Sequence, residues 1–147
     1  MSRIIVTRTI DAPIDLVFQT VADERRLSQV LPHIVNVEFL SDVRAGVGTR
    51  FRETRLMNGK EATTELEVTE FVENEHVRLV TTDSLGTTWD TVFAVTADNG
   101  GTKLTMTMDA RADKWLAKVF VFVIRSMIKR AVERDMDLVK RFCDNDQ

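Results

Sequence analysis

The sequence contains one cysteine, no tyrosine and only two histidines among its 147 residues. The single thiol, Cys143, excludes an intramolecular disulfide and a cysteine-based metal centre, and it suits a reducing compartment. Without tyrosine, no phenol can act as a catalytic acid. His33 and His76 lie in or beside predicted turns, with no partner at metal-ligand spacing. We therefore expect no metal site.

Long uncharged apolar runs and glycine-rich phosphate loops are also missing. No stretch of about 18 apolar residues occurs that could cross a bilayer. The first eight residues are too polar for a signal peptide, and the six glycines form no nucleotide-binding motif. The net charge of −3 argues against a nucleic-acid partner. These absences predict a cytoplasmic protein without a cofactor or a transmembrane segment.

Two kinds of hydrophobic periodicity are present. Residues 3–11 alternate and predict a first strand, whereas the helical spacing after Pro13 predicts one or two short helices over 13–31. Beyond these, a helix without Gly or Pro is predicted over 112–143, and the length fits one domain over 1–147. The intervening period of two predicts strands at 34–41, 48–57, 60–71, 76–83, 87–97 and 102–110.

An Asn-Gly pair at residues 58–59 is the strongest two-residue signal for a β-hairpin. Centring the turn there aligns opposite charges on one face and apolar or small residues on the other. The predicted pairs are Arg52–Glu65, Arg50–Glu67, Phe51–Leu66 and Thr49–Val68. This two-faced pattern is typical of an antiparallel sheet with one buried side.

A second Asn-Gly turn at residues 99–100 predicts another hairpin. It pairs Val95 with Leu104, Phe93 with Met106, Thr91 with Met108, and Asp90, unfavourably, with Asp109. The sequence does not decide which side of the strand 76–83 faces inward. A mostly antiparallel sheet followed by one long helix predicts an α+β fold with the helix on the concave side.

Short motifs follow these elements in a fixed order. They are Ile10-Asp11-Ala12-Pro13 with Val17-Phe18, Gly48-Thr49-Arg50-Phe51, Val68-Thr69-Glu70-Phe71 and Gly101-Thr102-Lys103-Leu104, followed by the C-terminal helix. In this order and spacing, essentially the whole chain resembles the START-like (SRPBCC) superfamily of polyketide cyclases/dehydrases and Bet v 1-like proteins.

The resemblance implies a helix-grip fold, in which a seven-stranded antiparallel sheet wraps around the long C-terminal helix and two short helices follow the first strand. It also implies a cavity between sheet and helix for a small hydrophobic molecule. Members of the superfamily include lipid and quinone carriers as well as aromatase/cyclases. The fold therefore does not decide between binding and catalysis.

Glu53 and Arg55 are the candidate functional charges. They are two residues apart on the strand 48–57, so they share the inward face with Phe51. A buried charge has to be paired or functional, because isolating it costs on the order of several kcal/mol. Arg55 can anchor a carbonyl, phenolate or carboxylate while Glu53 orients the ligand or moves a proton. Alternatively, the two residues form a mutual, mainly structural ion pair.

The other side chains predicted on the inward side are apolar or small. The sheet contributes Phe51, Thr64, Leu66, Trp89, Thr91, Phe93, Met106 and Met108, and the long helix contributes Leu116, Phe120, Val123 and Met127. Methionine adapts to irregular ligands and equally fills irregular cores, so these residues describe the cavity and the core at once.

The long helix also carries a basic stripe, consisting of Lys114, Lys118, Arg125 and Lys129. This stripe fits a solvated outer face, an anionic membrane surface or a partner. Within residues 119–124, apolar side chains point to so many sides of the helix that the sheet alone cannot cover them all. Another surface has to cover the rest. A homodimer contact, a loop or a lipid surface would each serve.

The apolar stripe of this helix changes direction along its length. Around residues 116–127 it centres on Leu116, Val123 and Met127, but later it moves toward Val132, Met136, Val139 and Cys143. A straight helix drifts by only about 20° per heptad, whereas this rotation is on the order of 100°. We therefore predict a kink or break near Ser126, or two packing environments for the two halves, with the first half forming a wall of the cavity.

Three functions remain open from the sequence. The first is binding, with or without transport, of a lipid, an isoprenoid quinone or a polyketide-like aromatic molecule. The second is an enzyme of the cyclase/aromatase or dehydratase kind, in which Arg55 polarises a carbonyl and Glu53 moves a proton. The third is a protein-interaction module that uses the exposed part of the long helix.

Overall fold

The computed structural model describes residues 2–145. In chain order the elements are β1 (Ser2–Ile10), α1 (Ile14–Ala22), α2 (Glu24–Val30), β2 (Ile34–Phe39), β3 (Arg50–Met57), β4 (Lys60–Val72), β5 (His76–Thr82), β6 (Thr88–Asp98), β7 (Gly101–Arg111) and α3 (Trp115–Asn145). Every predicted element is present, with small differences at its ends. No helix within the described residues is long and apolar enough to cross a membrane.

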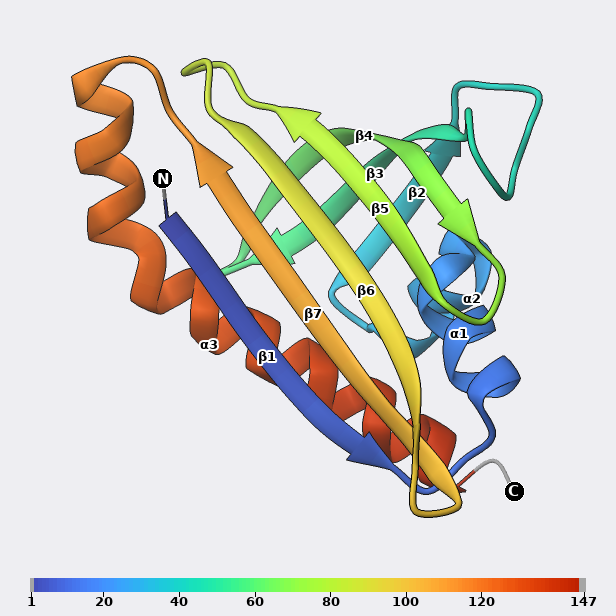
Figure 1. Cartoon of the computed structure of the whole chain (residues 1–147). Coiled ribbons are helices and arrows are strands. Elements are labelled where there is room, and N and C mark those ends of the chain that lie inside the picture. Colours follow the sequence, from blue (N-terminus) through green and yellow to red (C-terminus); the bar gives the residue numbers. More distant parts are fainter. Residues whose placement is uncertain (1, 146–147) are drawn as a thin grey trace.

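All seven strands form one antiparallel sheet in the order β1-β7-β6-β5-β4-β3-β2. The sheet curves, with α3 along β1 at one side and α1 and α2 at the other (Figure 1). This is the α+β helix-grip arrangement that the resemblance implies. The fold prediction is confirmed.

Both Asn-Gly turns have the backbone geometry that their sequence predicts. Asn58 and Gly59 have φ of 52° and 77°, and Asn99 and Gly100 have φ of 49° and 86°. Positive φ at both central residues is typical of the type I′ turn, whose twist matches that of paired strands. The register follows: Phe51 pairs with Leu66 in the first hairpin, and the pairs predicted for the second are all present.

A β-bulge in β4 settles the orientation of β5. The register shifts between Val68 and Glu70, so that Val68 pairs with Leu79 while Phe71 pairs with Val77. The extra residue turns Phe71 to the inward side, where its ring packs edge-on against Phe18 at 5.3 Å. Val77 is fully buried. The odd-numbered residues of β5 therefore face inward.

The core lies where α1, α2 and the second half of α3 meet the sheet. Pro13 stands at the N-cap of α1, where its lack of an N–H costs nothing, and the Asp23 side chain caps α2 by accepting a hydrogen bond from the backbone N–H of Arg25. Completely or almost completely buried side chains from these elements and the sheet include Ile10, Phe18, Leu31, Leu104, Met136 and Val139.

The packed side of α3 is one continuous face. Its buried residues are Ala117, Val121, Val132, Met136, Val139 and Cys143. At about 100° per residue, they all fall on one side of the helix. Only the apolar pattern rotates, because the second half fixes which side meets the sheet. The two halves nevertheless pack differently, as predicted: the first half buries two residues and the second half four. As a result, Leu116 and Val123 are 65% and 68% exposed.

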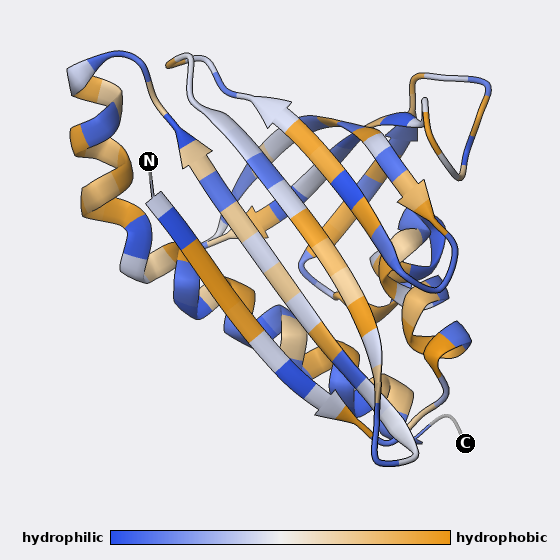
Figure 2. Ribbon diagram, viewed as in Figure 1, coloured by the Kyte–Doolittle hydropathy of each residue, from blue (hydrophilic) through white to orange (hydrophobic). Residues whose placement is uncertain are grey.

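The predicted change in direction of α3 is present. Figure 1 shows the first turns (orange) standing to one side of the sheet and the remainder (red) running beneath β1. The helix is unbroken from Trp115 to Asn145, so the change is a bend and not a break. Figure 2 shows that the first turns are rich in hydrophobic residues.

Candidate functional site

The centre of the candidate site is an ion-pair network at Arg55 of β3. Arg55 Nε donates to Glu53 Oε1 at 2.6 Å, and Arg55 Nη1 donates to Asp135 Oδ2 of α3 at 2.7 Å. The Glu53 side chain is almost fully buried, whereas those of Arg55 and Asp135 are partly exposed. The predicted Glu53–Arg55 ion pair is present, and Asp135 extends it to the long helix.

Glu24, the first residue of α2, adds a second carboxyl group. It is 7% exposed and shares a hydrogen bond with Glu53. Burial, together with the hydrogen bond and negative charge of Glu53, raises the pKa of Glu24 to about 10, so this carboxyl is protonated at neutral pH. Its Oε2 atom is buried and has no hydrogen-bond donor among the described residues.

Glu53 remains the charged member of this pair. Burial alone would raise the pKa of Glu53, but the hydrogen bond with Glu24 and the charge and hydrogen bond of Arg55 outweigh burial and lower that pKa. If Glu24 and Glu53 were both ionised, their buried negative charges would repel strongly, so one of the two carboxyl groups keeps its proton. The cluster thus combines a neutral carboxyl donor, a carboxylate and a guanidinium. It can donate to a carbonyl and accept from a hydroxyl.

The hollow beside Glu24 is small. It measures about 20 Å³ and lies between α2, the loop 40–49 and the sheet, with Leu27, Arg44 and Phe51 among its lining residues. This volume fits one water molecule, whereas pockets for small molecules measure roughly 300–1,000 Å³. The hollow therefore has room for water beside Glu24 and not for a ligand.

The sheet residues predicted for the cavity face one side, as the registers show. Glu53 pairs with Thr64, Phe51 with Leu66, Thr91 with Met108 and Phe93 with Met106. Leu79 of β5 shows that the β3–β4 residues and the β6–β7 residues face the same side, because it pairs with both Val68 and Thr91. Of this set, Phe51, Thr91, Phe93 and Met106 are buried, whereas Thr64, Leu66, Trp89 and Met108 are half-buried. Part of the inward apolar face is thus open.

The helix residues predicted for the same cavity lie elsewhere. Leu116, Phe120, Val123 and Met127 are all exposed, on the side of α3 opposite its buried face. The first half of α3 stands beside the sheet and does not cover it (Figure 1). The structure therefore brings together the sheet part of the predicted site without the α3 part.

Two members of the cluster, Glu24 and Asp135, were not predicted from the sequence. Glu24 precedes Leu27 by three residues and Leu31 by seven, and both leucines are buried, so helical spacing placed it on the packed face. Asp135 precedes the buried Val139 by four residues on the packed side of α3. The signal that could have identified both residues was an acidic residue at helical spacing from buried apolar residues.

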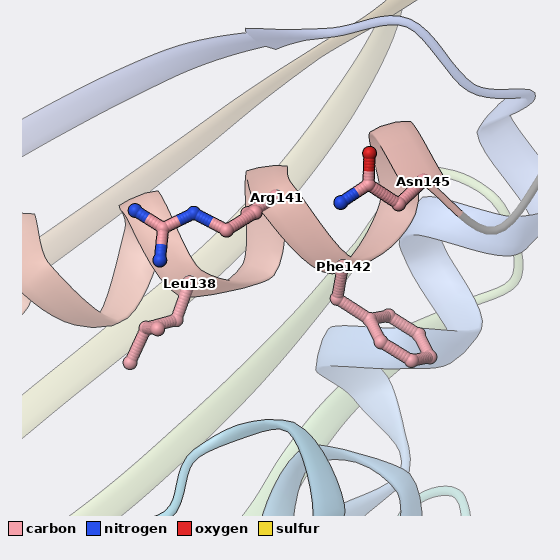
Figure 3. Close-up of a pocket in the computed structure, with 4 residues that line it drawn as sticks. All are labelled: Leu138, Arg141, Phe142 and Asn145. Atoms are coloured by element: carbon pink, nitrogen blue, oxygen red, sulfur yellow. The ribbon is translucent and has the colours of Figure 1, made fainter.

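Other hollows lie away from this cluster. One of about 350 Å³ is formed at the C-terminal end of α3 by Leu138, Arg141, Phe142 and Asn145 (Figure 3). Its side chains come from successive turns of one helix, so it is a surface depression. Among residues 2–145, no three acidic, histidine or cysteine side chains are placed to hold a metal ion.

Solved structures of low sequence identity share this fold. TTHA0849 from Thermus thermophilus is 17% identical with a TM-score of 0.72, and the match covers 97% of this chain and 94% of that one. Ara h 8.0201 is 17% identical with a TM-score of 0.74, covering 97% of both chains. The di-domain ARO/CYC StfQ from the steffimycin biosynthetic pathway is 12% identical with a TM-score of 0.81, covering 97% of this chain and 50% of that one.

At these identities the solved structures establish the fold alone. No curated protein matches in sequence. The model of one protein family, described as polyketide cyclase / dehydrase and lipid transport, matches residues 1–143. Since this match spans nearly the whole chain, the protein belongs to the polyketide cyclase/dehydrase and lipid transport family.

Proposed function

We propose that this protein binds a small amphipathic molecule on the inward face of its sheet. Apolar side chains such as Leu66, Trp89 and Met108 would contact the hydrophobic part, and the Arg55 cluster would bind a carbonyl, hydroxyl or carboxylate. The observation that carries the proposal is a buried, hydrogen-bonded polar cluster on the same face as half-buried apolar side chains. Lipids, quinones and polyketide-like aromatics have this chemistry.

Binding is favoured over catalysis by the proton affinities of the two glutamates. An efficient general acid or base has a pKa near the working pH. The pKa of Glu24 is about 10, and that of Glu53 is lowered, so neither group exchanges its proton readily at neutral pH. These properties suit fixed hydrogen bonding to a ligand.

Native mass spectrometry of gently purified protein tests the proposal directly. We expect a co-purified apolar molecule, or uptake of at least one of three probes: oleate, decylubiquinone and 1-naphthol. Met108→Trp would fill the inward face and weaken probe binding by at least about tenfold. Thr107→Trp changes the neighbouring outward position and serves as the matched control. An empty protein that takes up none of the probes would contradict the proposal.

The polar cluster is tested separately by Arg55→Met. Loss of a charge-assisted hydrogen bond should weaken oleate binding by roughly tenfold or more. Binding of a purely hydrocarbon probe should change little, because such a probe makes no polar contact. Equal losses for both probes would mean that the variant is misfolded or that Arg55 serves structure alone.

The alternative is a cyclase- or dehydratase-like enzyme, for which the presence of paired carboxyl groups beside an arginine is the favouring observation. In that case Glu53→Gln should abolish turnover of a poly-β-keto or hydroxyacyl substrate and retain its binding. Turnover that survives the substitution would remove Glu53 from the reaction.

A further inference from the structure

The first half of α3 presents a large apolar surface to solvent. We call it the docking face, and its residues are Trp115, Leu116, Val119, Phe120, Phe122, Val123 and Met127. All seven are exposed, with Phe122 as much as 70%. Such a continuous apolar surface is unusual for a protein that remains free in water, and it marks a contact site.

The charge beside the docking face has a single sign. Residues 114–132 include five basic residues and no acidic one, although the whole chain has a net charge of −3. At about 100° per residue, Lys114, Lys118, Arg125 and Lys129 form a strip at the edge of the docking face, on the line that the buried residues of the second half continue. Neither Arg125 nor Lys129 forms an ion pair within residues 2–145.

A hollow at the edge of the sheet continues this surface. It measures about 430 Å³ and is lined by Arg3, Ile4 and Ile5 of β1 and by Phe122, Arg125, Ser126 and Lys129 of α3. Ile5 is about half exposed, on the outer side of the sheet. Arg3 is held in place by Asp109, with Nε and Nη2 at 2.7 and 3.0 Å from its two oxygens. Cations and apolar side chains therefore lie next to each other at the junction of two elements.

From these observations we propose that the docking face and the adjoining basic hollow bind the surface of an anionic lipid bilayer. The apolar side chains enter the boundary between headgroups and acyl chains, while Arg125, Lys129 and Lys118 contact anionic headgroups. A second copy of the chain is a poorer occupant, because an antiparallel two-fold contact through the docking face would place the basic strips of both copies along the same edge, where they repel. This inference does not depend on the ligand proposed above.

Vesicle co-sedimentation with the full chain tests the proposal. We expect binding to vesicles of phosphatidylcholine mixed with phosphatidylglycerol, a loss of binding as salt is raised, and little binding to phosphatidylcholine alone. Trp115 lies in the docking face and is one of only two tryptophans. In Trp89→Phe, fluorescence from Trp115 should therefore shift to shorter wavelength when anionic vesicles are added.

Charge and apolar variants separate the two parts of the surface. Arg125→Glu with Lys129→Glu should weaken vesicle binding by roughly tenfold or more. Arg134→Glu with Arg141→Glu makes the same change in charge at exposed positions of the second half of α3, and should weaken it much less. Phe122→Ser with Val123→Ser should also release the protein. The matched control is Val47→Ser with Leu56→Ser, at apolar positions that are exposed elsewhere.

Three outcomes would overturn the proposal. The first is no binding to anionic vesicles, and the second is equal binding to neutral and anionic ones. The third is a wild-type dimer in light scattering that Phe122→Ser with Val123→Ser converts to monomers, because the docking face would then be an interface between copies. The charge and apolar double variants should keep the wild-type circular dichroism spectrum, since their substituted side chains are exposed.

Discussion

Arg55 Nη1 of β3 lies 2.7 Å from Asp135 Oδ2 of α3, which joins two residues eighty positions apart in the sequence. The same guanidinium holds Glu53, so one arginine balances two carboxylates on different elements. The long helix is therefore tied to the sheet by a partly buried ionic contact as well as by apolar packing.

Arg55→Met should lower the free energy of unfolding by about 2–3 kcal/mol. Breaking a buried ion pair costs roughly 3–5 kcal/mol, and the partial exposure of Arg55 reduces that amount. Urea unfolding measures the loss. Arg52→Met is the matched control, because Arg52 faces outward on the same strand and pairs with Glu38 at the surface. If both variants lose the same stability, the Arg55 network does not stabilise the fold.

Glu24→Gln should flatten the dependence of stability on pH. The folded-state pKa of Glu24 is about 10, above its ordinary value of 4.5, so its contribution to stability is complete below 4.5 and is lost as pH rises toward 10. The wild type should thus lose up to about 1.4 kcal/mol per pH unit from this group between roughly pH 5 and pH 9. Glutamine cannot lose a proton, so this slope should disappear.

Urea unfolding over that pH range provides the measurement for Glu24→Gln. Glu67→Gln, at an exposed position on β4, is the control and should keep the wild-type slope. An unchanged slope in Glu24→Gln would show that Glu24 is ionised in the folded protein at neutral pH.

Two methionines of α3 test which side of the helix is packed. Met136 is 1% exposed and Met127 is 39% exposed. Met136→Ala should lower the unfolding free energy by about 2–4 kcal/mol, because it leaves a cavity in the core. Met127→Ala should lower it by less than about 1 kcal/mol. A larger loss for Met127→Ala would mean that the first half of α3 packs on the sheet through the predicted stripe.

Arg78→Met tests how the outer face of the sheet tolerates two facing aspartates. Asp90 pairs with Asp109 across β6 and β7, but it receives hydrogen bonds from Arg78 at 2.9 and 2.6 Å and one from Arg111 at 3.2 Å. Removing Arg78 should destabilise the protein by about 1–2 kcal/mol at neutral pH.

Acid should reduce the effect of Arg78→Met. The hydrogen bond from Arg78 is the largest cause of the lowered pKa of Asp90, so the stabilisation is present above the ordinary value of 3.8 and lost as pH falls through the folded-state value. The difference from wild type in urea unfolding should therefore shrink at strongly acidic pH. Lys103→Met, an exposed substitution on β7, should show no such trend. A difference that persists in acid would assign the effect to packing.

The strands and the two Asn-Gly hairpins were predictable because their causes are local. Each Asn-Gly turn requires two residues with positive φ, and this fixes which residues of the two strands pair. The alternation of side chains along the strands then fixes which residues face inward. Glu53, Arg55 and Phe51 were placed on one side of the sheet by this reasoning, and the structure confirms that arrangement. The Glu53–Arg55 contact follows from it.

The β4 bulge and the polar cluster were not predictable in the same way. One extra residue after Val68 reverses the inward side of β4, and no local signal marked it, so the orientation of β5 remained undecided. Glu24 and Asp135 reach Glu53 and Arg55 only because α2, α3 and β3 converge in space. The high pKa of Glu24 likewise arises from burial and from Glu53, which are properties of the folded chain.

For α3, the sequence by itself determined a long unbroken helix, an apolar pattern that rotates along it, and a basic strip beside the apolar residues, because these depend only on residue order and helical period. The tertiary structure decided which side is buried. The second half packs through Val132, Met136 and Val139 and so fixes which side of the helix is buried. Since a helix cannot rotate one half independently of the other, the first half exposes its most apolar side, including Phe122 and Val123.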